Sequence, residues 1–160
     1  MHQACLLLGS NIDPERNIPG AVALLGERLV ILRTSSVWES ASVECCYPDY
    51  LDMAVLVSTS LEAEQLKQQV LRPLEARMGR VRTEDKNASR PIDIDIILFD
   101  GVLMDTTLFQ FAFRAVPVSE IFTDYRSPSG EDLKEIAKRL AAINPVELRK
   151  DISISWPGSE

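Results

Sequence analysis

The chain has 160 residues, an ordinary length for one domain, and 46% of them are apolar, which is enough to bury a core. Its net charge of −7 argues against a general nucleic-acid or membrane-surface binder, because such proteins need a positive field. One histidine and three cysteines without a CxxC spacing argue against a zinc site or a disulfide framework. We therefore expect a single cytoplasmic domain over residues 1–160, without a membrane segment.

The first third of the chain alternates strand-like and helix-like segments. Residues 4–11 form a short apolar run that ends in Gly-Ser-Asn and is typical of a buried strand. Residues 12–30 predict a helix with Asp13 as its N-cap, and Pro19 predicts a late start or a kink. Residues 30–40 have strand propensity throughout.

The middle of the chain contains the clearest elements. Residues 50–60 alternate and then become wholly apolar, which predicts a central strand. Residues 60–79 have an apolar face at helical spacing, with Ser60 as a possible cap and Gly79 as a terminator. Pro73 predicts a kink or a local break within this helix.

The later segments complete the pattern. Residues 80–90 form a polar loop, residues 91–99 a strand, and residues 100–105 a turn into another strand. Residues 130–143 predict an amphipathic helix, and residues 153–160 a loose or edge-paired tail. The order is strand, helix, strand, strand, helix, strand. It predicts an α+β protein with a ferredoxin-like βαββαβ core, an antiparallel sheet with helices on one face, and C-terminal extras.

Two aspartates interrupt the apolar strand over residues 91–99. Side chains alternate along a strand, so Asp93 and Asp95 point to one face while Ile92, Ile94 and Ile96 point to the other. The isoleucines are expected to pack on the helices. The aspartates are then expected about 7 Å apart on the face that the helices leave open.

Two interpretations of this acidic pair stay open. Outward positions on a half-exposed sheet are commonly polar, so the aspartates can simply be solvated. Against this, aspartate is depleted in strands, and two parallel carboxylates repel one another unless a cation lies between them. Magnesium suits such a site, because it binds through one or two carboxylates together with substrate phosphates. Six basic residues precede the strand and could hold those phosphates: Arg72, Arg77, Arg80, Arg82, Lys86 and Arg90.

A second candidate site lies at the start of the central strand. Tyr50 and Asp52 share a face, and an aromatic beside an acid can stack a flat heterocycle and accept hydrogen bonds from it. The alternative is a sheet-edge aromatic next to an exposed acid. Neither GxxxxGK[ST] nor GxGxxG occurs, so a nucleotide is not expected to bind as in P-loop or Rossmann proteins.

Three stretches, LLGSN, YPDYLDMAV and EARMGRVR…RPIDIDIILFDG, resemble the 6-hydroxymethyl-7,8-dihydropterin pyrophosphokinase family over most of the first 105 residues. The resemblance implies a ferredoxin-like fold. It also implies transfer of pyrophosphate from ATP, the co-substrate, to the hydroxymethyl group of the pterin, with release of AMP and two Mg²⁺ ions as cofactors.

The resemblance also implies roles for individual residues. It assigns the two magnesium ions to Asp93 and Asp95. It assigns contacts with the phosphates to Arg80, Arg82 and Arg90. It assigns nucleotide binding to Glu75 and again Arg82. It assigns pterin binding to Ser40, Tyr50, Asp52 and Phe113.

The chain departs from the family at four places, one of which is the threonine-proline stretch of the pterin loop, altered here to ESASVECC over residues 39–46. Asp52 stands where the family has asparagine, and an acid there is expected to prefer a donor-rich ligand edge. Asn87 replaces a tryptophan of the catalytic loop. The segment after Asp105 is shorter by about eight residues and lacks the histidine and arginine that hold ATP, for which Arg114 is a candidate substitute.

Three hypotheses follow from these departures. The first is an active pyrophosphokinase, whose activity is weak or altered. The second is a divergent paralogue that binds a pterin or a nucleotide without the transfer. The third is an interaction domain without a small-molecule site. For the first two we expect a monomer with small-molecule partners, and neither nucleic acid nor membrane as a partner.

Overall fold

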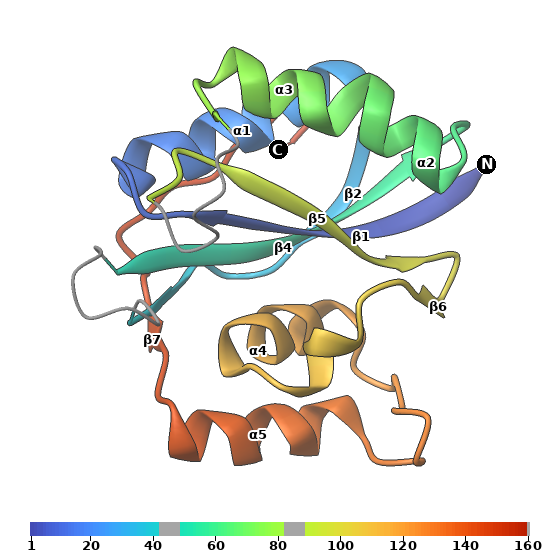
Figure 1. Cartoon of the computed structure of the whole chain (residues 1–160), viewed down its shortest axis with the longest axis vertical. Coiled ribbons are helices and arrows are strands. Elements are labelled where there is room, and N and C mark those ends of the chain that lie inside the picture. Colours follow the sequence, from blue (N-terminus) through green and yellow to red (C-terminus); the bar gives the residue numbers. More distant parts are fainter. Residues whose placement is uncertain (42–48, 82–88, 160) are drawn as a thin grey trace.

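The computed structural model describes residues 1–41, 49–81 and 89–159. In this part of the chain the strands are β1 (His2–Ser10), β2 (Val30–Thr34), β3 (Trp38–Ser40), β4 (Tyr50–Thr59), β5 (Asp93–Phe99), β6 (Val102–Leu103) and β7 (Glu147–Leu148). They form one seven-stranded antiparallel sheet in the order β6-β5-β1-β4-β3-β7 (Figure 1). The remaining strand, β2, pairs with the later part of β4, while β3 pairs with its beginning.

The helical elements are α1 (Pro14–Arg28), α2 (Ala63–Leu66), the π-helical turn η1 (Lys67–Leu71), α3 (Arg72–Arg77), the 3-10 turn η2 (Thr106–Phe109), α4 (Ala112–Ile121) and α5 (Leu133–Ile143). With β1 and β4 at the centre, this order confirms the predicted α+β class and ferredoxin-like core. None of the helices in the described residues is long and apolar enough to cross a membrane.

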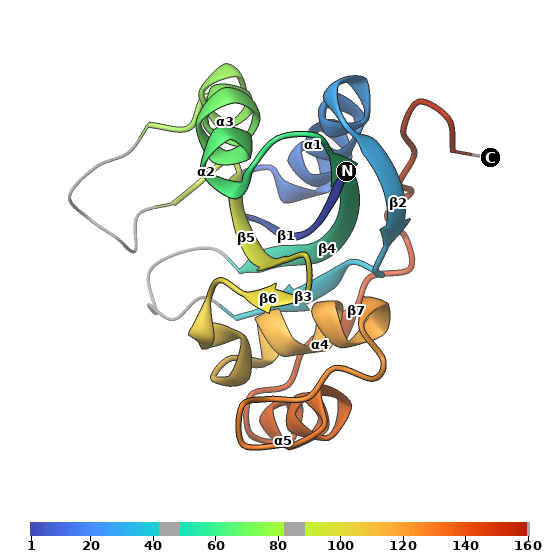
Figure 2. The same ribbon diagram turned by 90° about the vertical axis from the view of Figure 1, so that its right-hand side faces the viewer.

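Helices cover both faces of the sheet, each over its own apolar cluster. On one face α1 and the α2–η1–α3 segment pack over β1, β4 and β5. On the other face α4 packs over the sheet, and α5 packs on the outer side of α4 (Figure 2). The expectation of an open second face is therefore wrong, because α4 was not recognised as a helix. Pro117 lies inside it and has no backbone N–H to donate, which is atypical of a helix interior.

The first helix runs without a break from its start at Pro14. Pro19 is accommodated inside it, so the expected late start does not occur. Asp13 precedes the helix in a left-handed conformation (φ 45°), and its side chain makes no capping hydrogen bond. Its backbone carbonyl accepts from Arg16 and Asn17 instead. The predicted side-chain cap is thus wrong although the helix boundary is correct.

The helix predicted over residues 60–79 is confirmed, with a change of winding in its middle. The π-helical turn ends just before Pro73, so the local break falls where the proline predicts it. Its cap is Glu62, which forms a capping box with Gln65, and not Ser60. At the other end Gly79 adopts φ 94° and terminates the helix as predicted.

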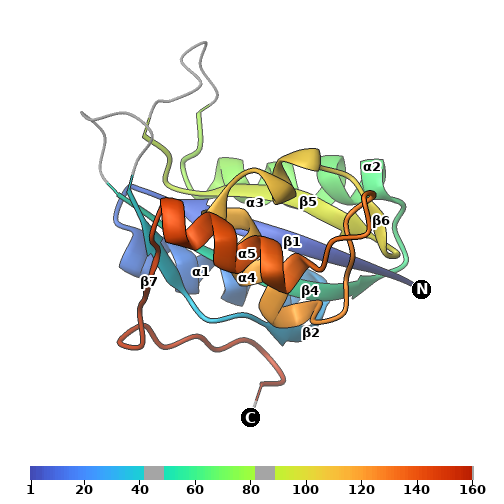
Figure 3. The ribbon, with the colours of Figure 1, turned by 90° about the horizontal axis from the view of Figure 1, so that it is seen from below.

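Two other segments differ from the sequence-based expectation. Residues 30–40 split into β2 and β3 at Ser35, whose hydroxyl accepts from the Ala54 amide at 2.8 Å in place of a ladder bond. The tail after β7 runs on to the C-terminus as an irregular segment (Figure 3). Its Ile152, Ile154 and Trp156 pack against the core cluster on the α1 face. It lies so close to α1 that a Cβ on Gly26 would be 2.8 Å from Pro157.

Candidate functional site

A row of cross-strand neighbours runs across the sheet at one end of β1. Asp93 of β5 pairs with Gly9, Gly9 pairs with Asp52 of β4, and Asp52 pairs with Trp38 of β3. Direct cross-strand partners point to the same face, which here is the α4 face. A Cβ on Gly9 would lie 2.8 Å from Asp52 Oδ1, so the glycine leaves the space between the two aspartates.

The alternation predicted for β5 is confirmed. Ile92 and Ile94 are fully buried beneath the helices of the first face, and Ile96 packs against the same cluster. Asp93 and Asp95 lie on the other face, with 16% and 29% of their side chains exposed. They are therefore not simply solvated outward positions, because Arg114 of α4 lies against Asp95, and Arg80 and Arg90 lie against Asp93.

Among the described residues, three arginines lie against this acidic pair. Arg90 Nη1 donates to Asp93 Oδ2 at 3.2 Å, and Arg80 Nη2 lies 3.7 Å from Asp93 Oδ1. Arg114 Nη2, from α4, donates to Asp95 Oδ2 at 3.3 Å. Even so, burial and the charge of Asp93 raise the pKa of Asp95 above its ordinary value. The pair still favours an added cation.

The donor set fits magnesium bound jointly with phosphate. Among the described residues, no group of three or more His, Cys, Asp or Glu side chains could hold a metal ion by itself. Asp93 and Asp95 offer oxygen ligands from two carboxylates only. Magnesium usually takes one or two carboxylates and completes its shell with water and substrate phosphates. A metal here would depend on a phosphate-bearing ligand.

Glu75 of α3 positions β5. Its side chain is 1% exposed, its Oε1 accepts from Arg72 Nη1 at 2.8 Å, and its Oε2 accepts from the Ile94 amide at 2.7 Å. The carboxylate thus bonds the strand between the two aspartates. Nucleotide binding by Glu75 stays a prediction, and the geometry gives it a structural role as well.

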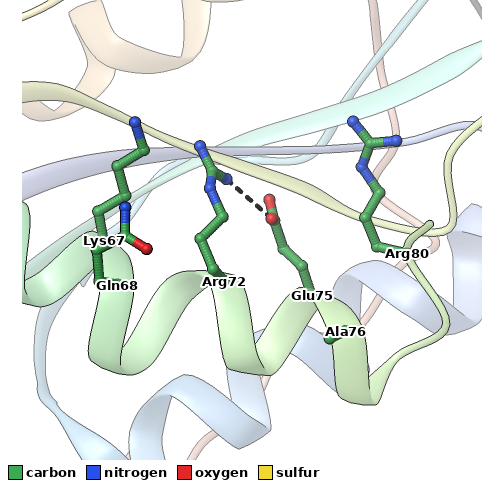
Figure 4. Close-up of a pocket in the computed structure, with 6 residues that line it drawn as sticks. All are labelled: Lys67, Gln68, Arg72, Glu75, Ala76 and Arg80. Carbon is green, nitrogen blue, oxygen red and sulfur yellow. Dashed lines mark hydrogen bonds and ion pairs between the residues drawn. The ribbon is translucent and has the colours of Figure 1, made fainter. Parts of the chain in front are cut away.

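A cationic pocket lies along the α3 side of β5. It has a volume of about 550 Å³, and Figure 4 shows its lining side chains: Lys67, Gln68, Arg72, Glu75, Ala76 and Arg80. A neighbouring pocket of about 200 Å³ shares Lys67 and Arg72 and reaches Asp95 and Asp105. Because the two pockets share two cationic side chains, they adjoin, and we refer to them together as the cationic channel. Its cations, with the carboxylates of Asp95 and Asp105 beside them, suit a polyphosphate with a metal ion.

The third part of the site surrounds Asp52 on β4, and we call Ser40, Tyr50 and Asp52 the Asp52 edge. Ser40 pairs with Tyr50 across β3 and β4, and Ser40 Oγ donates to Asp52 Oδ2 at 3.2 Å. Asp52 is 4% exposed, and burial raises its pKa to about 8. Near neutral pH its carboxyl is mostly protonated, so it can donate as well as accept. The expected preference for donor-rich ligands concerns the ionised acid and stays a prediction.

Phe113 lies at the start of α4 beside Arg114. Its ring stacks on Phe111 with centroids 5.2 Å apart, and the Arg114 guanidinium carbon lies 5.6 Å from its centroid. The charge of Arg114 also lowers the pKa of Asp52 against the effect of burial. The start of α4 therefore faces both the acidic pair and the Asp52 edge.

The structure adds residues that sequence reasoning did not single out. Asn11 of the LLGSN stretch is 2% exposed, and its Oδ1 accepts from the Arg90 amide at 2.6 Å, which fixes the entry to β5. Lys67 was missed because it lies five residues before Arg72, which is not a neighbouring spacing on a regular α-helix, and the turn between them is π-helical. Arg82 and Asn87 lie outside the described residues.

Comparison with known proteins gives one family and a consistent fold. A family model described as 7,8-dihydro-6-hydroxymethylpterin-pyrophosphokinase (HPPK) matches residues 5–123. The folic acid synthesis protein FOL1 of Dictyostelium discoideum is 31% identical over 134 residues, which cover 78% of this chain and 20% of that protein.

Solved structures of Plasmodium falciparum HPPK-DHPS share the fold. The wild type with pteroate has a TM-score of 0.67 at 11% identity, covering 88% of this chain and 42% of that chain. A triple mutant with pteroate has a TM-score of 0.69 at 11% identity, covering 89% and 44%. The chain thus spans a fifth of FOL1 and less than half of these structures. Its organisation as one domain over residues 1–160 stays a prediction.

Proposed function

Since the chain belongs to the 7,8-dihydro-6-hydroxymethylpterin-pyrophosphokinase family, we propose that it transfers pyrophosphate from ATP to the hydroxymethyl group of 6-hydroxymethyl-7,8-dihydropterin and releases AMP. The observation that supports this best is a continuity on the β5 edge. The cationic channel reaches Asp95, Asp93 lies two residues before it on the same face of β5, and Gly9 alone separates Asp93 from Asp52 in the cross-strand row. The proposed sites for ATP, for the metal ions and for the pterin are therefore neighbours.

The channel would hold the triphosphate. Lys67, Arg72 and Arg80 line it, and Arg90 stands at the acidic pair. Charge-assisted hydrogen bonds from these groups are stronger than neutral ones and orient phosphates. Phosphoryl transfer depends mainly on such positioning and on neutralisation of charge, so the protein needs no covalent intermediate.

Asp93 and Asp95 would hold two magnesium ions. When bound, these ions neutralise the phosphate oxygens and polarise the phosphorus that is attacked. The carboxylates themselves are positioned by the hydrogen bond from the Ile94 amide to Glu75, which fixes the strand between them. The number of ions rests on the family resemblance alone.

The Asp52 edge would bind the pterin. The protonated carboxyl of Asp52 and the hydroxyl of Ser40 can hydrogen-bond the polar edge of the ring, and Tyr50 and Phe113 supply aromatic surfaces. In the transfer the hydroxymethyl oxygen bonds to the β-phosphorus and loses its proton to water. The bond between that phosphorus and the oxygen shared with the α-phosphorus breaks, and AMP leaves with the oxygen.

The test is formation of AMP from ATP, magnesium and 6-hydroxymethyl-7,8-dihydropterin, followed by chromatography. The wild-type chain is expected to form AMP only when the pterin is present, and Asp95→Asn is the inactive control. Absence of pterin-dependent AMP from the folded wild type contradicts the proposal. Location in the cytoplasm and a monomeric state stay predictions beside it.

A second candidate is a paralogue that binds pterin or nucleotide without the transfer. The observation that favours it is Arg114, which engages the carboxylate of Asp95 that a metal would need. Calorimetry with the pterin and with α,β-methylene-ATP distinguishes the candidates when combined with the AMP assay. Binding of either ligand without AMP formation supports the paralogue, and binding of neither removes it.

A further inference from the structure

We propose that Arg114 is the internal counter-ion of the metal-binding carboxylates and makes binding of a divalent cation depend on nucleotide. In the ligand-free chain its guanidinium neutralises Asp95 and Asp105. When a nucleotide arrives, its phosphates draw the guanidinium off, and Asp95 is released to the metal. This inference rests on the proposed function for the identity of the nucleotide site.

The first support is the geometry of the guanidinium. Nη2 donates to Asp95 Oδ2 at 3.3 Å, and Nη1 donates to Asp105 Oδ2 at 3.4 Å. Strong arginine–carboxylate pairs are bidentate to one carboxylate at about 2.7–2.9 Å. Arg114 instead bridges two carboxylates with one long bond to each. Such a bridge is readily exchanged for a better acceptor.

The second support is unused donor capacity. The Arg114 side chain is 17% exposed, and its Nε is buried and makes no hydrogen bond within residues 1–41, 49–81 and 89–159. A guanidinium has five N–H donors, and a buried unsatisfied donor is unfavourable. A phosphate with three or more acceptor oxygens could satisfy donors that the two aspartates leave unused.

The third support is that Asp105 does not need Arg114. Its Oδ1 accepts from the Thr107 amide at 3.0 Å and from Thr107 Oγ1 at 2.6 Å, which caps the η2 turn. If Arg114 moves, Asp105 keeps these partners. Asp95 loses the guanidinium that donates to its Oδ2. The vacated side of Asp95 then favours a metal ion.

The position of the pocket explains why nucleotide and metal would act together. Asp95 and Asp105 line the same pocket of about 200 Å³ as Lys67 and Arg72, which come from the other side of β5. A divalent cation that enters alone meets the charge of Arg114 and is repelled. A cation that enters with phosphates does not, because the phosphates pair with Arg114. Binding of the two ligands is therefore coupled and reciprocal.

The test measures two affinities that the proposal moves in opposite directions. Mn²⁺ alone and α,β-methylene-ATP with excess Mg²⁺ are each titrated by calorimetry into the full chain and into Arg114→Gln. Loss of the competing charge is expected to tighten Mn²⁺ binding about 10-fold. Loss of a phosphate ligand is expected to weaken nucleotide binding about 10- to 100-fold.

Two further variants keep the result interpretable. Arg114→Lys retains the charge without the planar fork, so Mn²⁺ affinity is expected to stay at the wild-type value while nucleotide affinity recovers in part. Arg139→Gln removes an arginine that pairs with Glu131 on the exposed side of α5, and neither affinity is expected to change. Circular dichroism and the thermal midpoint verify that each variant is folded.

The outcomes separate this inference from the proposed function. If Arg114→Gln weakens both affinities, or changes neither, Arg114 is only structural and the inference is overturned. If the affinities move in opposite directions but the wild type forms no AMP, the counter-ion role stands and the transfer proposal fails. If no variant binds the nucleotide, the inference is overturned.

Discussion

The acidic pair Asp93 and Asp95 and the single acid Asp52 lie on the same α4 face of the sheet, but they differ in burial and in the charges beside them. Asp93 and Asp95 are partly exposed and are surrounded by Arg80, Arg90 and Arg114. Asp52 is more deeply buried, and the hydrogen bond that it accepts comes from the neutral hydroxyl of Ser40. The first pair keeps enough positive charge nearby to remain a cation site. The second becomes a neutral acid with amide-like hydrogen bonding. Neighbouring cations, not residue type, decide which chemistry an aspartate offers.

The largest expected effect is on the charged pair. Asp95→Asn removes one of the two charges available to metal, so the rate of AMP formation is expected to fall about 1000-fold or more. The measurement is kcat in the AMP assay at saturating magnesium. The thermal midpoint is expected not to fall, because repulsion from Asp93 is also removed. An unchanged kcat would show that Asp95 is not a metal ligand.

The next effect concerns a carboxylate that is as buried as Asp52 yet paired with an arginine. Glu75→Ala removes the partner of Arg72 and of the Ile94 amide, and the free energy of unfolding is expected to fall by about 3 kcal/mol. Urea denaturation measures this loss. Glu75→Gln is the matched control and is expected to lose less, because its amide oxygen can still accept from Ile94. Equal losses for the two variants would mean that shape, and not hydrogen bonding, is decisive.

Asp52→Asn tests whether the second acid is neutral. The pKa of Asp52 is about 8 in the folded chain and about 4 in the unfolded chain, so between these pH values the folded state holds a proton that the unfolded state has lost. Stability of the wild type should therefore fall as pH rises through this window, by at most about 1.4 kcal/mol per pH unit. Urea unfolding at pH 5, 7 and 9 should show a smaller fall for the variant. Parallel pH profiles would show that Asp52 is ionised in the folded chain.

The smallest expected effect comes from the glycine between the acidic pair and Asp52. Gly9→Ala would place a Cβ 2.8 Å from Asp52 Oδ1, and the shift needed to relieve this contact is expected to cost about 1–2 kcal/mol. Pterin affinity should fall, while affinity for α,β-methylene-ATP should stay unchanged, because the cationic pocket lies on the other side of β5. Calorimetry with each ligand measures both. A matching loss of nucleotide affinity would show that the two parts of the site are not independent.

Local patterns were sufficient for much of the fold. The apolar runs of β1 and β4, the alternation of β5 and the terminator Gly79 each depend on residues close in sequence, and each is confirmed. The capping residue of the second helix was wrong because Ser60 and Glu62 both suit a cap, and the capping box with Gln65 favours the latter. The helix α4 was missed because Pro117 contradicts its propensity, and packing on the sheet overrides that.

The amino-acid sequence by itself determined which residues could form the site, because alternation and family motifs place Asp93, Asp95, Tyr50 and Asp52 without reference to distant contacts. Only the tertiary structure decided their electrostatic states. Arg114 reaches Asp95 from α4, which packs on that face of the sheet, and burial raises the pKa of Asp52 to about 8. Burial and neighbouring charge depend on which strands and helices meet in space, and no local pattern contains that information.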